Sequence, residues 1–215
     1  MRDTPPLQVK VWGEFACFTR PEMKVERVSY PVMTPSAARG ILEAIFWKPE
    51  FDWRIREIRV LKDIRMFSIL RNEINSRQSH RSAKGWIENG GGYFADDDRA
   101  QRHTLGLRDV AYVILADMEL RKHADADIAK YRDQFRRRVQ RGQCVHRPYL
   151  GCREFAADFG EPNGEKPIDR TEDLGRMLGD LVYQGNGRAT PVFFEARLEN
   201  GALYVPPSIY AGGVA

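Results

Sequence analysis

The segment with the clearest capacity for chemistry is a basic stretch of 24 residues, from Lys130 to Arg153. It holds eight basic residues against the single acid Asp133, so its net charge of +7 exceeds the +4 of the whole chain. Most of the eight are arginines, whose planar guanidinium matches phosphate oxygens and stacks on bases. A solvated helix face is the alternative interpretation, but the preference for arginine favours nucleic-acid binding. The basic residues are Lys130, Arg132, Arg136, Arg137, Arg138, Arg141, Arg147 and Arg153.

The cysteine spacing, the triple glycine and the carboxylate run of the sequence do not predict a metal site, a cofactor site or a disulfide framework. The cysteines are Cys17, Cys144 and Cys152, an odd number without CxxC spacing, so neither disulfides nor a zinc site are expected and a reducing cytoplasm fits best. The triple glycine at 90–92 lacks the lysine of a phosphate-binding P-loop. The carboxylate run at 96–98 is read as a solvated loop. We therefore expect no metal and no cofactor.

Nothing in the sequence indicates a membrane protein. No run approaches the roughly 20 apolar residues that a bilayer span requires. The first residues also lack the apolar stretch of a secretory signal. We expect a cytoplasmic protein that does not contact membranes.

Two helices are predicted to position the basic segment and its surroundings. Thr34 is a suitable N-cap with proline at the next position, and apolar residues then recur at helical spacing until Pro49. Asp125 is expected to cap the second helix, and Gly142 is expected to end it. Its apolar stripe consists of Ile128, Tyr131, Phe135 and Val139.

The remaining elements read mainly as strands. Alternating apolar residues predict a first strand from Leu7 to Phe18, and a period of two predicts two strands between 53 and 74, broken near 62–63. Residues 75–102 are polar and glycine-rich and read as a long, mobile hairpin or loop. Residues 104–120 read as a strand pair, and Asn200-Gly201 predicts a hairpin turn.

This order of elements predicts an α+β protein. A ferredoxin-like (RRM-like) domain with the order βαββαβ is expected over residues 1–143. A small antiparallel β-sheet domain is expected over residues 144–215. The fold by itself does not establish RNA binding.

One stretch of the basic segment resembles a known family. Residues 142–155, GQCVHRPYLGCREF, are similar to the signature of the CRISPR-associated RAMP protein of type I-C systems. Residues 15–22, 40–49 and 99–110 also match, and the resemblance covers most of residues 7–160. It implies a ferredoxin-like domain with a glycine-rich hairpin, followed by an antiparallel sheet.

The resemblance also implies an activity and its residues. Family members cut CRISPR repeat RNA without a metal ion and then remain in a surveillance complex with other CRISPR-associated subunits. The family's catalytic set is a tyrosine in the first helix and a lysine-histidine pair. In this chain these positions hold Phe46 and Lys130-Tyr131, so two of the three residues differ.

Because two of the three catalytic positions differ, other side chains are needed to transfer protons. Cleavage by the RNA's own 2′-hydroxyl needs a base, an acid and a cation near the phosphorane. Lys130 can supply the cation and Tyr131 can act as an acid, although its place on the apolar stripe is equally compatible with burial. Phe46 can transfer no proton. His146, in the signature, and His123 are the preferred histidines, ahead of two others at 80 and 103. Binding of RNA is assigned to Arg136, Arg137, Arg138, Arg141, Arg147 and Arg153.

Three functions therefore stay open at this stage. The first is a metal-independent endoribonuclease that processes precursor CRISPR RNA. The second is a non-cleaving RNA-binding subunit, which the altered catalytic set favours. The third is a DNA-binding protein or metal-dependent nuclease, with duplex DNA as its partner, because phosphate attraction does not distinguish RNA from DNA.

Overall fold

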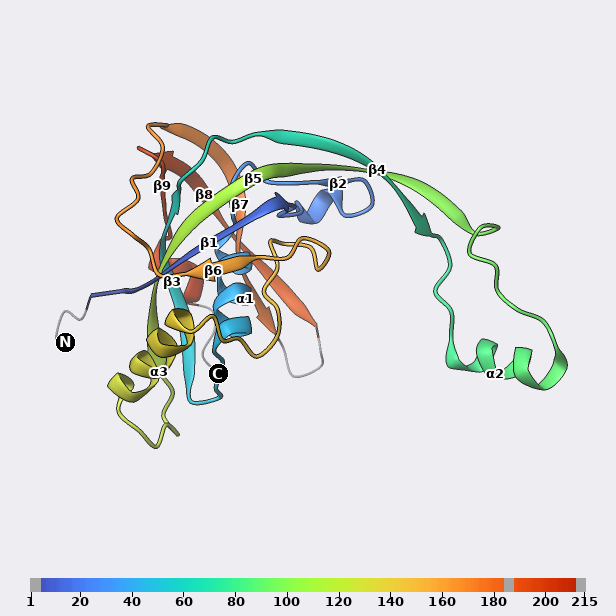
Figure 1. Cartoon of the computed structure of the whole chain (residues 1–215), viewed down its shortest axis with the longest axis horizontal. Helices are drawn as coiled ribbons and strands as arrows, with labels where there is room; N and C mark the ends of the chain where they lie inside the picture. Colours follow the sequence, from blue (N-terminus) through green and yellow to red (C-terminus); the bar gives the residue numbers. More distant parts are fainter. Residues whose placement is uncertain (1–4, 184–187, 212–215) are drawn as a thin grey trace.

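The computed structural model describes residues 5–183 and 188–211, which form an α+β fold built on one curled sheet (Figure 1). Within these residues the sheet has nine strands, seven of them in the order β6-β1-β5-β3-β9-β8-β7, while β2 and β4 pair with β5. The strands are β1 (Leu7–Ala16), β2 (Arg27–Val28), β3 (Phe51–Val60), β4 (Met66–Ile74), β5 (Arg99–Leu120), β6 (Asp158–Gly160), β7 (Glu172–Tyr183), β8 (Ala189–Glu199) and β9 (Ala202–Tyr204). The helices are α1 (Pro35–Ile45), α2 (His80–Asn89) and α3 (Ile128–Gln140), with short 3-10 helices η1 (Pro21–Met23) and η2 (Pro207–Tyr210).

Strand β5 pairs with four other strands of the sheet, and it differs from the prediction made for this region. The strand pair expected over residues 104–120 is wrong, because Arg99–Leu120 is one strand of 22 residues. Its second half lies between β1 and β3, and its first half pairs with β4 from Met66↔Leu107 to Ile74↔Arg99. The predicted break between β3 and β4 is confirmed.

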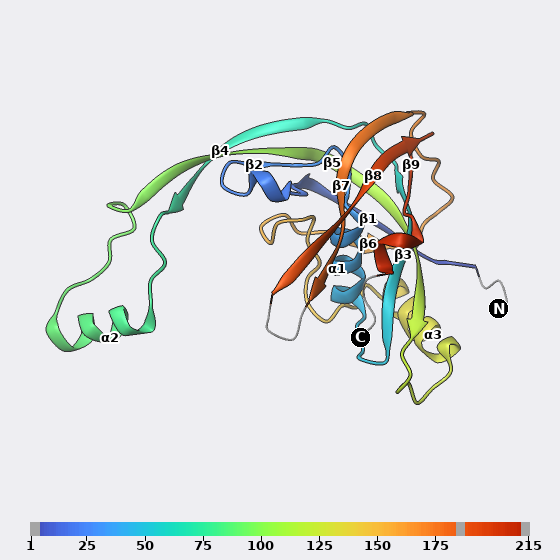
Figure 2. The ribbon, with the colours of Figure 1, turned by 180° about the vertical axis from the view of Figure 1, so that it is seen from behind.

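The first half of β5, with β4 and α2, forms an arm that reaches away from the rest of the chain (Figures 1 and 2). The expected hairpin at residues 75–102 is thus present, but it carries a helix that the sequence reading missed. Ser79 caps α2 by accepting a hydrogen bond from the Ser82 N–H at 3.1 Å. No residue of α2 is buried, and its few apolar residues lie within a stretch that is otherwise polar and glycine-rich.

Helix α1 forms where it was predicted. The Thr34 side chain accepts a hydrogen bond from the Ala37 N–H at 3.2 Å, and the apolar face packs into the core. The helix ends at Ile45 rather than at Pro49, because Phe46 already has extended backbone dihedral angles. The segment from Phe46 to Glu50 is therefore a loop between α1 and β3.

Helix α3 also forms, but with a different cap. Asp127, rather than Asp125, caps it, and its carboxylate accepts a hydrogen bond from the Ala129 N–H at 2.7 Å. Asp125 instead accepts a hydrogen bond from the Tyr131 hydroxyl at 3.1 Å. The predicted stop is confirmed, since Gly142 follows the helix with a positive φ of 62°.

An aromatic cluster joins both helices to the sheet. The ring of Phe51, at the start of β3, lies 5.5 Å from the rings of Phe46 and Tyr131. The Trp53 ring lies 4.9 Å from that of Phe135 in α3. This packing fixes the end of α1 against the first turns of α3.

The C-terminal strands continue the same sheet. Strand β9 pairs with β3, and β8 and β7 follow outward. The predicted hairpin turn is confirmed, with positive φ values at Asn200 (48°) and Gly201 (76°). Strand β6 lies beside β1. Among the described residues, no helix is both long and apolar enough to cross a bilayer.

Candidate nucleic-acid interface

One side of α3 presents a row of cations with no partners. Lys130, Arg137 and Arg141 follow one another at intervals of seven and four residues, which places them on the same side of a helix with about 3.6 residues per turn. All three are exposed, and none has a side-chain ion pair or hydrogen bond to another residue in 5–183 or 188–211. We call these three residues the cation row. Free guanidinium and ammonium groups in such a row can bind successive phosphates.

The other basic residues of α3 are engaged within the protein. Arg136 lies on a different side of the helix, where its Nη1 is 3.0 Å from Asp133 Oδ1. Arg132 is buried and donates to the Pro5 carbonyl. The basic run in the sequence is therefore spread over several sides of α3 and does not form a single face.

Arg138 joins α3 to α1. It is half-buried, its Nη1 donates to the Ile45 carbonyl at 2.8 Å, and its guanidinium lies 5.3 Å from the centre of the Phe46 ring. The last carbonyls of a helix lack intrahelical partners and carry partial negative charge, so a cation is favourable there. Arg138 thus holds the end of α1 next to the side of α3 that carries the cation row.

We expect Arg138→Ala to lower the free energy of unfolding by about 1.5–3 kcal/mol, since it removes a charge-assisted hydrogen bond and leaves a carbonyl unpaired. Chemical denaturation measures this change. The control is Arg136→Ala, whose exposed ion pair is worth less than about 1 kcal/mol. Equal stability of the two variants would contradict this role for Arg138.

The two positions where the chain departs from the expected catalytic set are both buried. Phe46 is 1% exposed and Tyr131 is 2% exposed. Burial and the hydrogen bond to Asp125 raise the pKa of the Tyr131 hydroxyl above its usual value. Because this hydroxyl already donates to Asp125, it presents no free acid at the surface. Lys130, one residue earlier, is exposed to solvent.

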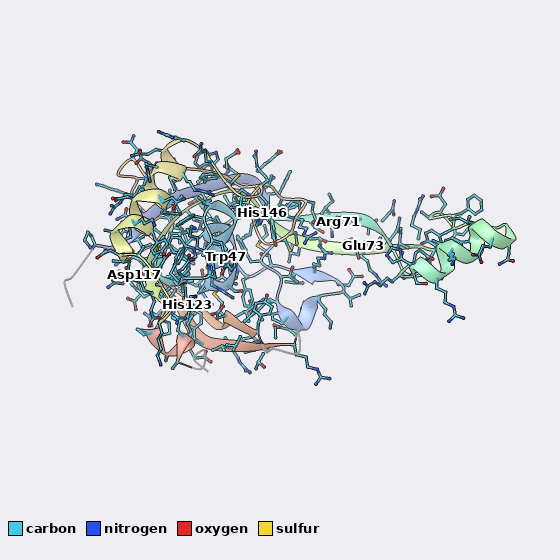
Figure 3. All side chains as sticks on the ribbon, turned by 90° about the horizontal axis from the view of Figure 1, so that it is seen from below. Trp47, Arg71, Glu73, Asp117, His123 and His146 are labelled. Atoms are coloured by element: carbon cyan, nitrogen blue, oxygen red, sulfur yellow. The ribbon has the colours of Figure 1, made fainter. Side chains whose placement is uncertain are left out.

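The two preferred histidines occupy different places (Figure 3). His123 lies on the segment that leads into α3, and its Nε2 is 3.0 Å from the Pro49 carbonyl in the α1–β3 loop. His146 lies in the signature segment, where its backbone N–H donates to the Ala44 carbonyl of α1. Both side chains are exposed. His123 therefore contacts the α1–β3 loop, in which Phe46 lies, and it precedes the helix that carries Lys130.

His146 instead borders a cavity of about 420 Å³ beside α1. Tyr149 and Glu43 line the same cavity. Burial raises the pKa of the Glu43 carboxyl above its usual value, and Arg39, at 3.3 Å, opposes this shift. The remaining histidines belong to the arm, since His80 begins α2 and His103 lies in the outer part of β5.

The signature segment is anchored at the end of β1 by a close backbone approach. The Cys17 N–H donates to the Leu150 carbonyl at 3.0 Å, and Gly151 has a φ of 86°. A Cβ at Gly151 would lie 2.1 Å from the Cys17 carbonyl oxygen, so only glycine fits. Cys152 packs against Cys17, with its Sγ 3.4 Å from Arg27 Nη1. Gly151 and Cys152 of the signature segment thus have structural roles.

We expect Gly151→Ala to destabilise the fold by more than about 2 kcal/mol, because it combines left-handed backbone strain with a clash against backbone. Gly142→Ala is the matched control, since Gly142 also has a positive φ (62°) but a Cβ there meets no atom within 4 Å. Thermal unfolding of both variants checks this. Equal midpoint temperatures of unfolding for the two variants would show that the close approach of Gly151 to Cys17 is not needed for stability.

The arginines of the signature segment differ in their partners. Arg147 Nη2 lies 2.6 Å from Asp158 Oδ1 in β6. Arg153 is exposed and has no ion pair to any other described residue. Of the predicted RNA-binding arginines, three are thus free to bind a phosphate without breaking a contact with the described part of the chain: Arg137, Arg141 and Arg153.

The carboxylate run at 96–98 stabilises the turn that leads into β5. Asp98 accepts hydrogen bonds from the Ser76 N–H at 2.9 Å and from the Tyr93 hydroxyl at 2.8 Å, and Asp96 pairs with Arg99. In the part of the chain that the structure describes, no group of three or more His, Cys, Asp or Glu residues is placed to hold a metal ion.

The similarity that decides the family extends over nearly the whole chain. Residues 7–206 match the family Cas_Cas5d, described as CRISPR-associated protein (Cas_Cas5). The chain belongs to the Cas5d family. Two relatives bear the name CRISPR pre-crRNA endoribonuclease Cas5d. The one from Thermus thermophilus is 49% identical over an alignment of 222 positions that covers 95% of this chain and 93% of the relative. The one from Mannheimia succiniciproducens is 44% identical over an alignment of 218 positions that covers 94% of this chain and 95% of the relative.

A solved structure has a similar fold. A crystal structure described as a CRISPR-associated protein superposes with a TM-score of 0.68 at 22% identity, covering 94% of this chain and 92% of that one. The family that the sequence resembles is therefore confirmed by the family match and the two relatives, and the expected α+β class is confirmed by the fold.

Within this Cas5d-family chain, the structure groups some predicted site residues and separates others. Lys130, Arg137 and Arg141 share one side of α3, and His123 lies on the adjoining loop. His146, Arg147 and Arg153 lie in the signature segment. Sequence reasoning missed the exposed Trp47 in the α1–β3 loop, because a tryptophan beside an apolar helix is usually part of the core.

Proposed function

We propose that this chain binds the repeat RNA of a precursor CRISPR transcript, cleaves it without a metal ion, and then stays bound to the product. The observation that carries the proposal is the cation row on α3, which has no partners among the described residues. The row begins at Lys130, where the sequence resemblance implies a catalytic lysine. The names of the two relatives, both pre-crRNA endoribonucleases, support the activity.

We propose a role for each accessible group. Attack by a 2′-hydroxyl on the adjacent phosphorus builds negative charge on the phosphorane, and Lys130 is the cation available to stabilise it. His123 is the exposed imidazole beside the α1–β3 loop and is suited to move a proton to or from the reacting oxygens. Tyr131 is buried and bound to Asp125, so its part is to position the start of α3. Arg137 and Arg141 bind the phosphates that follow along the strand.

His146 is the second candidate for proton transfer. Its cavity is lined by both polar and apolar side chains and lies beside the signature segment with Arg153. The separate variants His123→Ala and His146→Ala decide between the two imidazoles. Substitution of the catalytic histidine should slow RNA cleavage more than substitution of the other.

We also propose that the core of the sheet is ferredoxin-like. The order β6-β1-β5-β3 with antiparallel neighbours, together with α1 and α3, supports this reading. The division into domains at residue 143/144 stays a prediction. Retention in a multi-subunit surveillance complex is supported by the arm, which exposes Ile74, Ile87 and Phe94 away from the body.

The test is incubation of the purified chain with a repeat RNA in excess chelator. We expect one specific cut, with a 2′,3′-cyclic phosphate on one product and a 5′-hydroxyl on the other. RNA that is tightly bound but intact would identify a non-cleaving subunit. Cutting of duplex DNA that needs added magnesium would instead favour the metal-dependent nuclease.

A further inference from the structure

The loop between α1 and β3 is fastened by hydrogen bonds to its backbone carbonyls. Four carbonyls from residue 45 to residue 50 accept bonds from different parts of the fold. The donors are Arg138 Nη1 to Ile45 (2.8 Å), Trp53 Nε1 to Phe46 (3.0 Å), His123 Nε2 to Pro49 (3.0 Å) and the Arg121 N–H to Glu50 (2.9 Å). Since α3, β3 and the segment after β5 all hold it, the loop is a rigid support.

This support presents one large side chain to solvent. Trp47 is 55% exposed, although its neighbour Phe46 is 1% exposed and Trp53 is 2% exposed. Among the described residues, no aromatic ring stacks on the Trp47 indole and no cation lies over it. Scattered exposed apolar residues are common on protein surfaces. An unpartnered indole on an immobilised backbone is different, because the protein already bears the entropy cost of fixing its position.

The surroundings of Trp47 indicate what it binds. Arg138 ties the last residue of α1, two positions before Trp47, to the helix that carries the cation row, and His123 contacts the α1–β3 loop two positions after Trp47. In the view of Figure 3, Trp47 is seen between His123 and His146. Aromatic side chains next to a row of free cations are the combination by which proteins hold single-stranded RNA, with bases stacked and phosphates paired.

We propose that Trp47 is a stacking platform for one unpaired base of the RNA strand. Stacking there would place the adjoining phosphates along the cation row and next to Lys130. This inference rests on the proposed function and adds a substrate-binding residue to it. A π-face accepts any base, so the contact sets the position of the strand rather than its sequence.

The test compares Trp47→Ala and Trp47→Phe with wild type, using a single-stranded repeat RNA in chelator. We expect Trp47→Ala to bind about tenfold more weakly, with an unchanged slope of log K against log salt, because no ion pair is lost. Trp47→Phe keeps a ring and should bind within about threefold of wild type. RNA should also quench more fluorescence in wild type than in Trp47→Phe, since the indole contacts the base.

The matched control is Tyr204→Ala in β9, a ring that is 56% exposed and lies outside both α3 and the α1–β3 loop. Its affinity for RNA should equal that of wild type. If Trp47→Ala binds RNA as wild type does, or if RNA quenches Trp47→Phe as much as wild type, the stacking proposal is wrong. That result leaves the proposed function intact, whereas a wild-type chain that neither binds nor cuts the RNA overturns the function itself.

Loss of subunit association with unchanged RNA affinity would make Trp47 a protein contact and likewise overturn the proposal.

Discussion

Lys130→Ala should slow cleavage of repeat RNA by about 100-fold or more, because removing one preorganised charge from a developing oxyanion costs about that much. The dissociation constant should change by less than about fivefold, since one exposed cation contributes little to ground-state affinity. Single-turnover cleavage with saturating enzyme separates the two quantities. The position of Lys130 in the first turn of α3, exposed and without a partner in the described residues, is the reason for this expectation.

Two variants make the Lys130 result specific. Lys130→Arg keeps a cation and should retain more activity than Lys130→Ala. Lys166→Ala removes an exposed lysine from the loop between β6 and β7 and should cut RNA at the wild-type rate. If Lys130→Ala loses affinity and rate in equal proportion, Lys130 is a binding residue and its proposed role in the transition state is wrong.

The double variant Arg137→Ala/Arg141→Ala should bind RNA about 10- to 100-fold more weakly at moderate salt, because each side chain is expected to pair with one phosphate. The slope of log K against log salt should fall in magnitude by about 1.4, which corresponds to two fewer contacts on a single strand. Titrations at several salt concentrations give both values.

Arg136→Ala is the control for the double variant, since Arg136 is on the same helix but faces another direction and pairs with Asp133. Its affinity and salt slope should match those of wild type. A double variant with unchanged slope would mean that the cation row is only a solvated face of α3, and the RNA would have to follow another surface.

The sequence predicted what is encoded locally. Thr34, Pro35 and the apolar spacing after them specify α1 through capping and burial, and Asn200-Gly201 specifies its turn through positive φ. For Tyr131 the sequence left two alternatives open, an acid or a buried residue of the apolar stripe of α3, and the structure shows that it is buried. These features depend on residues within one or two turns of each other.

Features that depend on distant contacts could not be predicted. Asp125 and Asp127 are equally good caps by type, and only the packing of Tyr131 decides that Asp125 binds its hydroxyl. The three consecutive arginines look alike in sequence, yet Arg138 bonds to the end of α1 and Arg136 to Asp133, which leaves Arg137 free among the described residues. Helix α2 was not predicted because its few apolar residues lie in a polar, glycine-rich stretch.

The most direct test of metal-free cleavage at this surface uses a repeat RNA with a single 2′-deoxy nucleotide immediately 5′ of the cut. In excess chelator, the wild-type chain should cut the all-ribose RNA and leave a 2′,3′-cyclic phosphate. It should bind the deoxy-substituted RNA equally well and leave it intact, because the attacking hydroxyl is missing. Cleavage of the substituted RNA at the same position and rate, or cleavage of either RNA only after magnesium is added, would contradict the mechanism.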